Sequence, residues 1–536
     1  MTDWNFADVW DVVAEAFPAR EALVQGGQRV SWNGFERRAR EMAAFLVGAG
    51  LGRQAKVAQY LYNCPAYLET LYACLKASMV PVNTNYRYTE DELLYLWENS
   101  DAEAVVFDSS FADRVETIRS RLPAVRAWVC VGGGCPDWAV PYGQATGGAA
   151  PGWDRSGDDL IFIYTGGTTG MPKGVMWRQD DLFAVLNRTG ELRYPEDGGL
   201  EGVRRVLAAP PRHPPPRLLP GPPLMHGTGL FTAMSVLSSA GTVVMPTSRH
   251  LDAESILDLV ERERVTEMSI VGDAFAKPIL AALDANPGRW DISSLWLVIS
   301  SGVMWSPETK AGLLRHNPGM TLVDTLGSTE AVGMARSVTR AAGGGDAPPA
   351  RFVVGPDTKV IDDEGREVPP GSGEQGRLAL RGRGPLGYYK DPDKTAGTFV
   401  VIDGERWAIP GDFATVAADG TVQLLGRGSV CINTGGEKVF PEEVEEVLKR
   451  HPSVADAVVV GVPDERFGEA VTAVVEAAPG ASIAEGELGD WVRASLAGYK
   501  APRHVVRVET IGRSPSGKVD YRALRERALR AVGPRA

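Results

Sequence analysis

One loop of this sequence combines residue types that suit it to bind a phosphate chain. An apolar segment, Leu160–Thr165, has the composition of a buried strand and runs directly into Tyr164–Gly174, which reads YTGGTTGMPKG. Glycines let backbone N–H groups turn toward an anion without obstruction, while the threonine hydroxyls and the lysine add donors and positive charge. The sequence therefore predicts a polyphosphate cradle, which does not match the Walker A pattern. Its members are Thr165, Gly166, Gly167, Thr168, Thr169, Gly170 and Lys173.

Further short segments follow this loop in the chain and place glycines beside acids or a lysine. They are Leu326–Glu330 (LGSTE), Trp407–Asp412 (WAIPGD), Gly426–Arg427 with Gly435–Glu442 (GGEKVFPE), and Pro515–Lys518 (PSGK). Together with the glycine loop, and in this order, they resemble the signature motifs of the adenylate-forming superfamily, which contains acyl-CoA synthetases, luciferases and peptide-synthetase adenylation domains. The resemblance covers essentially the whole chain. The segments Met79–Asp101 and Thr165–Asp181 look most like actinobacterial acyl-CoA synthetases that act on long-chain or steroid acids.

The resemblance implies that a carboxylic acid is activated with ATP as an acyl adenylate, with release of pyrophosphate, and is then transferred to CoA. Negative charge accumulates on phosphate oxygens when the carboxylate attacks the α-phosphate, so fixed cations and N–H donors stabilise the transition state. Mg²⁺ needs a hard carboxylate ligand. Glu330 resembles the family residue with that task, and Thr329 resembles the hydroxyl beside it on the α-phosphate. ATP, Mg²⁺ and CoA are therefore the expected co-substrates and cofactor.

Further nucleotide contacts are implied by position within the motifs. Asp412 can accept hydrogen bonds from both ribose hydroxyls, as acids do in other nucleotide folds, and Arg427 resembles the family arginine that also reaches the ribose. The family commonly has Tyr at the position of Leu326, which can cover adenine with apolar surface but without aromatic stacking. The other residues expected around the nucleotide are Ser301, Gly302, Val303, Asp324 and Gly327.

The end of the chain is expected to form a mobile domain. We expect residues 1–428 to bind AMP and the acyl substrate and residues 429–536 to carry the catalytic Lys518. By resemblance, Lys518 bridges the carboxylate and the phosphate during adenylation, and rotation about a hinge at Ser429 then brings the acceptor loop to the site. That loop holds Gly435, Gly436, Glu437 and Lys438. Ser429 departs from the Asp or Lys that the family commonly has at its hinge.

Residues 218–248 contain no Asp, Glu, Lys or Arg. A transmembrane helix needs about 20 continuous apolar residues, and prolines and glycines interrupt this stretch. We therefore expect a loop, a buried helix at Thr228–Ser239 and a strand at Thr242–Met245, which line an apolar tunnel for a hydrophobic acid. His226 matches the aromatic or His position at the mouth of the family's acyl pocket, where it would gate or contact the substrate, although a lone His is more often structural.

Helical and strand patterns alternate along the chain, as in the helix Trp32–Ala49, the strand Val57–Leu61 and the helix Tyr67–Ala77. This rhythm predicts an α/β fold: a large N-terminal domain of parallel-sheet αβα layers with a β-rich subdomain at Val353–Gly426, and a small α+β C-terminal domain. Two local expectations are an N-cap at Asp252, before the helix Ala253–Glu263, and a C-terminal helix at Ile483–Ala497.

Composition narrows the class of function. The 536 residues include 56 Lys and Arg against 68 Asp and Glu, so the net charge of −12 gives no general attraction to nucleic acid or anionic lipid. The five cysteines lack zinc spacing and the six histidines form no H-x-x-x-H pair, so no structural metal site is expected. The start of the chain lacks the pattern of a signal peptide, which together with the cysteine usage favours a reduced, cytoplasmic chain.

Two alternatives stay open at this point. The same adenylation chemistry could serve a different acceptor or oxyanion, such as a carrier protein, an amine or nitrite in a diazotisation, and no sequence feature excludes these. A non-catalytic nucleotide-binding protein would not need Lys173, Glu330, Asp412 and Lys518 together, which argues against it. The sequence names neither the acid nor the oligomeric state, and a homodimer is simply the commonest assembly.

Overall fold

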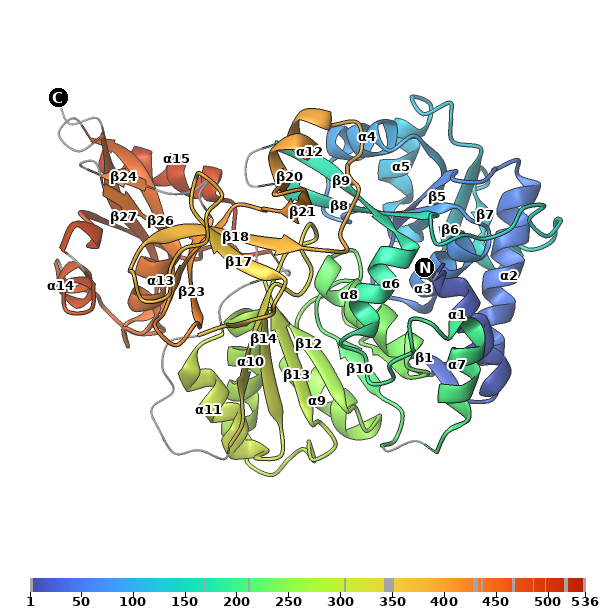
Figure 1. Ribbon diagram of the computed structural model, residues 1–536, viewed down its shortest axis with the longest axis horizontal. Coiled ribbons are helices and arrows are strands. Elements are labelled where there is room, and N and C mark those ends of the chain that lie inside the picture. Colours follow the sequence, from blue (N-terminus) through green and yellow to red (C-terminus); the bar gives the residue numbers. More distant parts are fainter. Residues whose placement is uncertain are drawn as a thin grey trace. The chain divides into compact units, whose positions relative to one another are not determined.

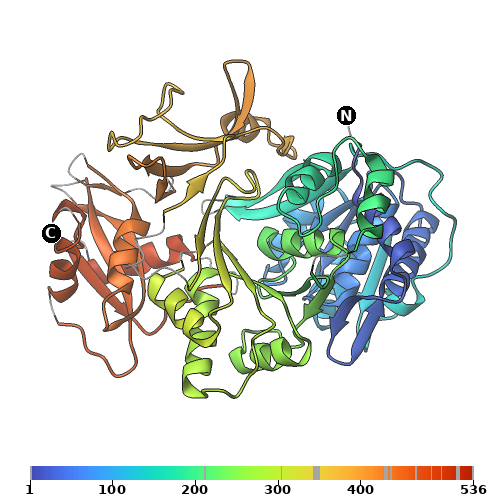
Figure 2. The same ribbon diagram turned by 60° about the horizontal axis from the view of Figure 1, so that its bottom comes forward.

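The structure is a computed structural model of the chain. It describes residues 3–167, 170–210, 213–302, 305–341, 351–427, 432–434, 437–464, 468–484, 486–496, 498–514 and 519–533. The chain forms two compact units. Unit 1 is Met1–Pro349 with Arg381–Val401, and unit 2 is Ala350–Leu380 with Ile402–Ala536. Figures 1 and 2 show the elements of each unit by colour along the chain.

One sheet of unit 1 carries the glycine loop. Its strand order is β19-β9-β8-β4-β3-β5-β6-β7, and the pairs from β8 to β7 are parallel. These strands are β3 (Lys56–Tyr60), β4 (Val80–Asn83), β5 (Ala102–Asp108), β6 (Ala127–Val131), β7 (Val140–Pro141), β8 (Leu160–Gly167), β9 (Gly170–Arg178) and β19 (Gly387–Tyr388). β9 and β19 are antiparallel additions at one edge. The apolar side chains of β3, β4 and β5 are buried, as parallel strands covered on both faces require.

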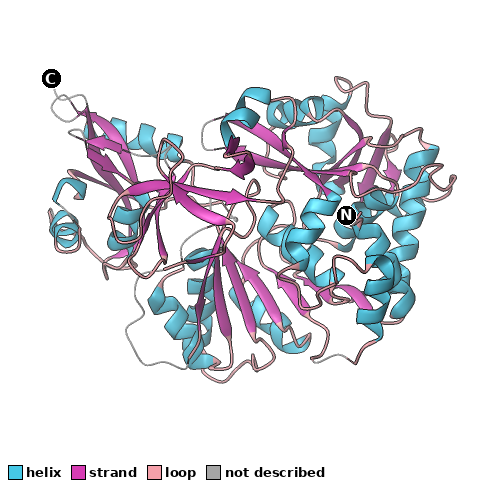
Figure 3. Cartoon of the chain, viewed as in Figure 1, coloured by secondary structure: helices cyan, strands magenta, loops and turns pink. Residues whose placement is uncertain are grey.

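The second sheet of unit 1 has the order β15-β14-β13-β12-β10-β11-β1-β2. It consists of β1 (Glu21–Gln25), β2 (Gln28–Ser31), β10 (Arg217–Pro220), β11 (Thr242–Met245), β12 (Glu267–Ile270), β13 (Leu297–Ser301), β14 (Thr321–Leu326) and β15 (Ala335–Thr339). The strands from β14 to β1 are parallel, while β15 and β2 pair antiparallel at the ends. Figure 1 shows β12, β13 and β14 side by side, and Figure 3 shows the helices that cover both sheets.

The helices of unit 1 alternate with its strands, as predicted. They are α1 (Phe6–Ala16), α2 (Trp32–Gly48), α3 (Pro65–Lys76), α4 (Glu90–Asn99), α5 (Ala112–Arg119), α6 (Gln179–Asn187), α7 (Gly199–Ala208), α8 (Gly227–Ser238), α9 (Ala253–Arg262), α10 (Gly272–Ala285), α11 (Pro307–His316) and α12 (Pro392–Thr398), with short 3₁₀ turns η1 (Ser109–Phe111) and η2 (Tyr142–Gln144). Asp252 caps α9 as predicted, because its side chain accepts from the Ser255 N–H. The uncharged stretch forms β10, α8 and β11. Within the described part of the chain, no helix is long and apolar enough to cross a membrane.

Unit 2 combines two sheets. In the first, β18 (Gln375–Arg381) lies beside β17 (Thr358–Ile361), β21 (Glu405–Ala408) and β22 (Asp412–Val416), and β22 pairs with β23 (Val422–Arg427). Short strands β16 (Val353–Val354) and β20 (Phe399–Ile402) lie at the points where the chain enters unit 2. This β-rich segment is the one predicted from the glycine- and proline-rich turns of residues 353–426.

The second sheet of unit 2 belongs to the C-terminal segment. Its strands are β24 (Ile432–Thr434), β25 (Glu437–Val439), β26 (Val454–Asp464), β27 (Gly468–Ala477) and β28 (His504–Val508). The helices are α13 (Pro441–Lys449), α14 (Glu487–Arg493) and α15 (Tyr521–Val532), with the turn η4 (Gly498–Lys500). The predicted α/β fold class with a small α+β C-terminal part is confirmed. The helix predicted at Ile483–Ala497 is shorter in the structure, where it is α14. The predicted domain boundary at residue 428 stays a prediction.

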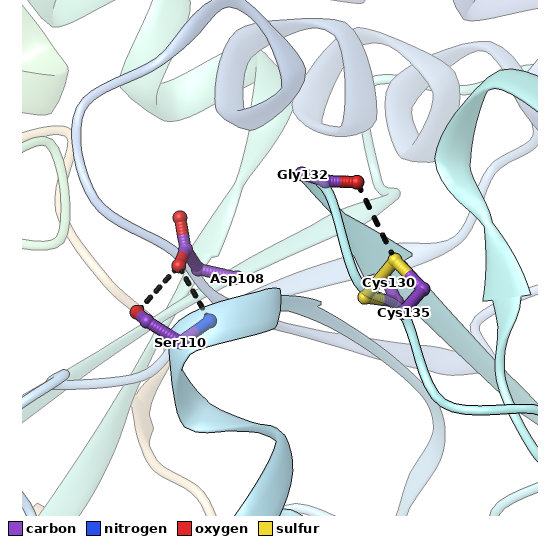
Figure 4. The surroundings of a disulfide bond; sticks show 5 residues. All are labelled: Asp108, Ser110, Cys130, Gly132 and Cys135. Atoms are coloured by element: carbon purple, nitrogen blue, oxygen red, sulfur yellow. Dashed lines mark hydrogen bonds between the residues drawn. A yellow bond between two sulfur atoms is a disulfide. The ribbon is translucent and has the colours of Figure 1, made fainter.

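The expectation of reduced cysteines is wrong for one pair, because Cys130 and Cys135 form a disulfide with their Cα atoms 5.8 Å apart (Figure 4). The four residues between them turn back at Gly132 and Gly134, which have φ of 114° and 72° and bring the two Cα atoms within disulfide range. The sequence signal for this pair is the short spacing of the two cysteines, with three glycines between them. Cys64 and Cys74 are free thiols, and burial raises the pKa of Cys64 to about 12.

Candidate active site

The predicted phosphate loop is the tip of a hairpin between β8 and β9. Thr165 pairs with Lys173 and Gly167 with Gly170 across the two strands. Thr168 and Thr169 lie outside the described residues. Gly174 is needed where the hairpin leaves the tip, because a Cβ there would lie 2.7 Å from the Tyr164 ring. The register of the two strands therefore determines the positions of the glycine N–H groups and of Lys173 along the hairpin.

The Lys173 ammonium pairs with the Asp391 carboxylate at the start of α12. Asp391 also caps this helix, since its other oxygen accepts from the Lys394 N–H at 3.0 Å. The hydrogen bond from Lys173 lowers the pKa of Asp391. The hairpin lysine is therefore held on a carboxylate of the same unit.

Glu330 lies beside the same hairpin. Its Oε1 accepts a hydrogen bond from Tyr388 Oη at 2.7 Å, and Tyr388 lies on β19, which pairs with β9 next to Val175. The carbonyl of Thr329 accepts from Trp177 Nε1 on β9 at 2.9 Å. Tyr388 and Asp391, only three residues apart, thus hold Glu330 and Lys173 respectively. The structure brings together these two predicted site residues, which are 157 positions apart.

The first turn of α8, which follows His226, lies next to Thr329. His226 is the residue before this helix and is half-buried. A Cβ on the next residue, Gly227, would lie 3.6 Å from Thr329 Oγ1. The residue after the predicted acyl-side histidine is therefore a neighbour of the predicted phosphate-side hydroxyl in unit 1.

A buried asparagine that the sequence reasoning missed connects these parts. Asn83, at the end of β4, donates through Nδ2 to the carbonyls of Tyr164 at 2.9 Å and Met225 at 2.6 Å, and its Oδ1 accepts from the Tyr164 N–H. Asn83 thereby links two segments. One is β8, which leads into the hairpin, and the other is Met225, the residue before His226. The available signal was a polar residue at the end of an otherwise apolar strand, VPVN.

The predicted adenine-side residues lie at the ends of neighbouring strands. Ser301 is the last residue of β13 and Gly302 follows it, while Leu326 is the last residue of the adjacent β14 and Gly327 follows it. Asp324 is buried and pairs with Lys310, and its pKa is raised by burial although Lys310 opposes the shift. Its carboxylate is therefore already engaged, and a nucleotide contact from Asp324 stays a prediction. Val303 lies outside the described residues.

Unit 2 contains the predicted ribose residues and the acceptor loop. Asp412 begins β22, is only 8% exposed, and is the backbone partner of Arg427 on β23. Glu437 and Lys438 lie on β25. Gly435, Gly436, Ser429 and the catalytic candidate Lys518 lie outside the described residues. The structure thus places Asp412 and Arg427 together and leaves the roles of the others as predictions.

A resident metal centre made of protein ligands is not seen in the described ranges, where no three His, Cys, Asp or Glu side chains gather. Glu330 is a single hard oxygen ligand beside the phosphate hairpin. This donor set fits Mg²⁺, which keeps several waters and is usually bound by one or two carboxylates together with substrate phosphates.

Comparisons with known proteins identify the family of this chain. The model of the AMP-binding enzyme family matches residues 10–389, and that of the AMP-binding enzyme C-terminal domain matches residues 443–518. The chain is 40% identical to a medium/long-chain-fatty-acid–CoA/3-oxocholest-4-en-26-oate–CoA ligase of Mycobacterium marinum, over 97% of this chain and 96% of the relative. It is 39% identical to a 3-oxocholest-4-en-26-oate–CoA ligase of Rhodococcus rhodochrous, over 97% and 95%.

Solved structures show the same fold. An anthranilate CoA ligase in complex with anthranoyl-AMP aligns with a TM-score of 0.83 at 22% identity, covering 99% of this chain and 98% of that chain. ATP-bound MatB from Rhodopseudomonas palustris aligns with a TM-score of 0.78 at 28% identity, covering 98% and 99%. The chain therefore belongs to the AMP-binding enzyme family.

Proposed function

We propose that this enzyme activates a hydrophobic carboxylic acid with ATP and transfers the acyl group to CoA. The observation that carries the proposal is the meeting of Lys173, Glu330 and the His226–Gly227 turn with the β8–β9 hairpin. The acid's carboxylate oxygen attacks the α-phosphorus of ATP, and the bond from that phosphorus to the bridging oxygen breaks to release pyrophosphate. The CoA thiol, after losing its proton, then attacks the acyl carbon and AMP leaves.

The hairpin residues have roles in the first step. Backbone N–H groups of Gly166 and Gly167, the Thr165, Thr168 and Thr169 hydroxyls, and Lys173 would hold the phosphates and stabilise their growing charge. Lys173 must exchange the Asp391 carboxylate for a phosphate oxygen when ATP binds. Thr329 would contact the α-phosphate. Glu330, oriented by Tyr388, would hold Mg²⁺, which when bound neutralises part of the phosphate charge.

The proposed acid is apolar. The relatives compared above are named for fatty acids and a steroid acid, and residues 218–248 of this chain contain no Asp, Glu, Lys or Arg. Met225, Leu230, Phe231 and Met234 of this stretch are buried apolar side chains beside His226. An acyl pocket lined by side chains of this kind would recognise its ligand by apolar area, with few polar contacts. We therefore place a medium- or long-chain fatty acid or a steroid acid in it.

The remaining parts complete the two half-reactions. Asp412 and Arg427 would hold the ribose, and Ser301, Gly302, Val303, Asp324, Leu326 and Gly327 the adenine side. Residues 429–536 would rotate so that Lys518 serves adenylation and the loop of Gly435, Gly436, Glu437 and Lys438 serves transfer. The proposal includes a cytoplasmic location and a homodimer, which is the commonest assembly.

The test is an ATP–pyrophosphate exchange screen over short, long-chain and steroid acids, followed by mass detection of products with and without CoA. We expect AMP, pyrophosphate and a CoA thioester, and a higher kcat/KM for hydrophobic acids than for acetate. ADP and phosphate as main products would contradict adenylation. Exchange that is normal while no thioester forms would point to the alternative acceptors instead.

A further inference from the structure

β4 and β8 are neighbouring parallel strands, and one side chain continues their pairing past the end of β4. Val82 on β4 is the register partner of Phe162 on β8. Asn83 is the last residue of β4. Its Oδ1 accepts from the Tyr164 N–H at 2.6 Å, and its Nδ2 donates to the Tyr164 carbonyl at 2.9 Å. A neighbouring strand would bond the same two backbone groups with its own peptide groups. The carboxamide of Asn83 therefore takes the place of a strand beside Tyr164.

The same carboxamide also reaches the acid side of the proposed site. Nδ2 carries two hydrogens, and it also donates to the Met225 carbonyl, at 2.6 Å. Met225 directly precedes His226, the N-cap residue of α8. Tyr164 directly precedes Thr165, the first residue predicted to bind phosphate. We call these three hydrogen bonds the Asn83 link, because they connect the residues before the two regions that must meet in adenylation.

The Asn83 link is buried and complete. Asn83 is 6% exposed, and its Oδ1 and both hydrogens of Nδ2 have partners. A carboxylate of the same shape has no hydrogen to donate. An aliphatic side chain would leave the backbone groups of Tyr164 and Met225 without these bonds, and buried polar groups that lose their partners are costly. The rest of β4 is apolar, so the amide at its last residue is specifically suited to join the two backbones.

Adenylation depends on the alignment of the two connected regions. The acid and ATP are separate molecules, and the carboxylate oxygen must approach the α-phosphorus in line with the bond that breaks. A displacement of about 1 Å between reacting groups lowers a rate about 10²-fold. The phosphates are proposed to bind at the hairpin and the acid beside His226. The position of one region relative to the other is therefore a quantity that the protein must control.

We propose that Asn83 is a positioning residue that fixes the hairpin relative to the acid-side loop, residues 222–225, for adenylation. The inference rests on the proposed function. Asn83 touches neither reactant in it and acts through the backbone of Tyr164 and Met225. Loss of Asn83 should lower kcat for adenylation more than it raises either KM, because each substrate keeps its own contacts while their alignment is lost. In the acyl adenylate the two halves are already joined by a covalent bond, so acyl transfer no longer needs this alignment.

Asn63 offers a matched control on the same loop. Its Oδ1 accepts from the Leu224 N–H at 2.7 Å, and its Nδ2 donates to the Pro222 carbonyl at 3.4 Å. Asn63 therefore bonds two backbone groups of the acid-side loop, as Asn83 bonds one. Within the described ranges, none of its hydrogen bonds reaches the hairpin. A substitution at Asn63 thus disturbs the loop without cutting its connection to β8.

The experiment measures both half-reactions on the full-length enzyme, with dodecanoate as the acid. Asn83→Leu removes all three bonds at similar volume, and Asn83→Asp keeps the acceptor for the Tyr164 N–H but loses both donated bonds. Asn63→Leu is the control. ATP–pyrophosphate exchange gives kcat and KM for adenylation. Single-turnover conversion of chemically prepared dodecanoyl adenylate to its CoA thioester gives the transfer rate, and thermal unfolding reports the stability of each variant.

Asn83→Leu should lower kcat for exchange about 10²-fold and Asn83→Asp about tenfold or more, with KM for ATP and dodecanoate changed less than about fivefold. Transfer from dodecanoyl adenylate should change less than about twofold. Asn63→Leu should lower kcat for exchange less than about threefold, and its main effect should be a higher KM for dodecanoate. A purely structural role would impair both half-reactions alike, so the ratio of the two rates is the deciding measurement.

Three results would overturn the inference. They are equal losses in exchange and transfer, a kcat of Asn83→Leu within about threefold of the wild type, and an equally large loss of kcat in Asn63→Leu. If Asn83→Leu does not fold, Asn83→Asp decides by the same ratio, because it keeps the volume and one bond. Wild-type enzyme that exchanges pyrophosphate with no acid would instead remove the proposed adenylation. That result is seen without any variant, so the two failures are distinguishable.

Discussion

The β8–β9 hairpin and the Asn83 link are held by different kinds of contact. At the hairpin, Lys173 pairs with Asp391 and Glu330 accepts from Tyr388. In the Asn83 link, a neutral carboxamide bonds the backbone of two other segments. Charged side chains can exchange their partners for a phosphate or Mg²⁺, whereas a buried backbone group that loses its partner has no substitute. The two regions should therefore respond differently to substitution, salt and the half-reaction that is measured.

The largest expected effect concerns the two half-reactions. Replacing Lys518 should impair adenylation and leave acyl transfer nearly unchanged. Lys518→Ala should slow adenylation by at least about 10²–10³-fold, as expected when one transition-state contact is removed. Conversion of a pre-made acyl adenylate to the thioester should be nearly unchanged, because Lys518 is proposed to have left the site. Single-turnover assays of both steps measure this, and equal losses in the two would contradict the rotating domain.

Glu330→Gln tests the hairpin site directly. Gln keeps the size of the side chain and an oxygen that can accept from Tyr388, but it removes the charge that would hold Mg²⁺. Pyrophosphate exchange should fall by about 10²-fold, with a higher Mg²⁺ concentration needed for half-maximal rate. Transfer from a pre-made adenylate should be affected less. A variant with normal Mg²⁺ dependence would show that Glu330 is not the metal ligand.

Tyr388→Phe tests whether the hydrogen bond from Tyr388 positions the Glu330 carboxylate. Loss of one hydrogen bond to a charged group costs about 1.5–3 kcal/mol, so kcat for exchange should fall about tenfold or more. The Mg²⁺ dependence should shift with it, which a purely structural loss would not cause. Tyr389→Phe is a close control, because its hydroxyl also bonds a carboxylate, that of Asp101, at 2.6 Å. Equal effects of the two substitutions would reject a positioning role for Tyr388.

Several elements were predictable because their signals are local. The cap at Asp252, helix α8 after His226 and strand β11 follow from side-chain periodicity and nearby turn residues. The return strand β9 was not predicted, because glycine, proline and lysine are poor strand formers and only pairing with β8 makes Gly170–Lys173 extended. The helix α14 is shorter than predicted because Gly486, with φ of 82°, stands just before its first residue.

The partners of the predicted site residues could not be found from the sequence. Lys173 and Asp391 are 218 positions apart, and Glu330 and Tyr388 are 58 apart. Both contacts depend on β19 pairing with β9, which no local pattern specifies. The contacts of Asn83 depend in the same way on β4 lying beside β8. The motifs thus predict which residues react, while the order of strands in the sheet determines which side chains contact Lys173 and Glu330.

Salt should separate the two regions by a smaller effect. Lys173 is partly exposed at the hairpin, and the Debye length falls from about 10 Å at 0.1 M to about 3 Å at 1 M salt. KM for ATP should therefore rise severalfold over this range. The kcat of Asn83→Leu relative to the wild type should stay constant, because the lost hydrogen bonds are neutral and buried. A ratio that changes with salt would contradict a neutral positioning role for Asn83.

The smallest expected effect concerns Asp391, which competes with phosphate for Lys173. Asn at this position can still cap α12, so Asp391→Asn removes the charge and keeps the helix start. Both partners are partly exposed, at 40% and 27%, so the pair contributes at most about 1 kcal/mol to stability and Tm should change little. KM for ATP should fall about two- to fivefold, because the binding step no longer has to break an ion pair worth that much.

The pH dependence gives an independent check on the same pair. Lys173 lowers the pKa of Asp391 below its ordinary value of 3.8, so the pair's stabilisation is complete above that value and is lost only as pH falls through the lowered pKa. The ratio of KM for ATP between wild type and Asp391→Asn should therefore be constant across neutral pH. Asp393→Asn, at an exposed position in the first turn of α12, is the control. If the Asp391 variant instead raises KM for ATP while the control does not, the carboxylate orients Lys173 for phosphate rather than competing with it, and the hairpin site would be preorganised as the Asn83 link is.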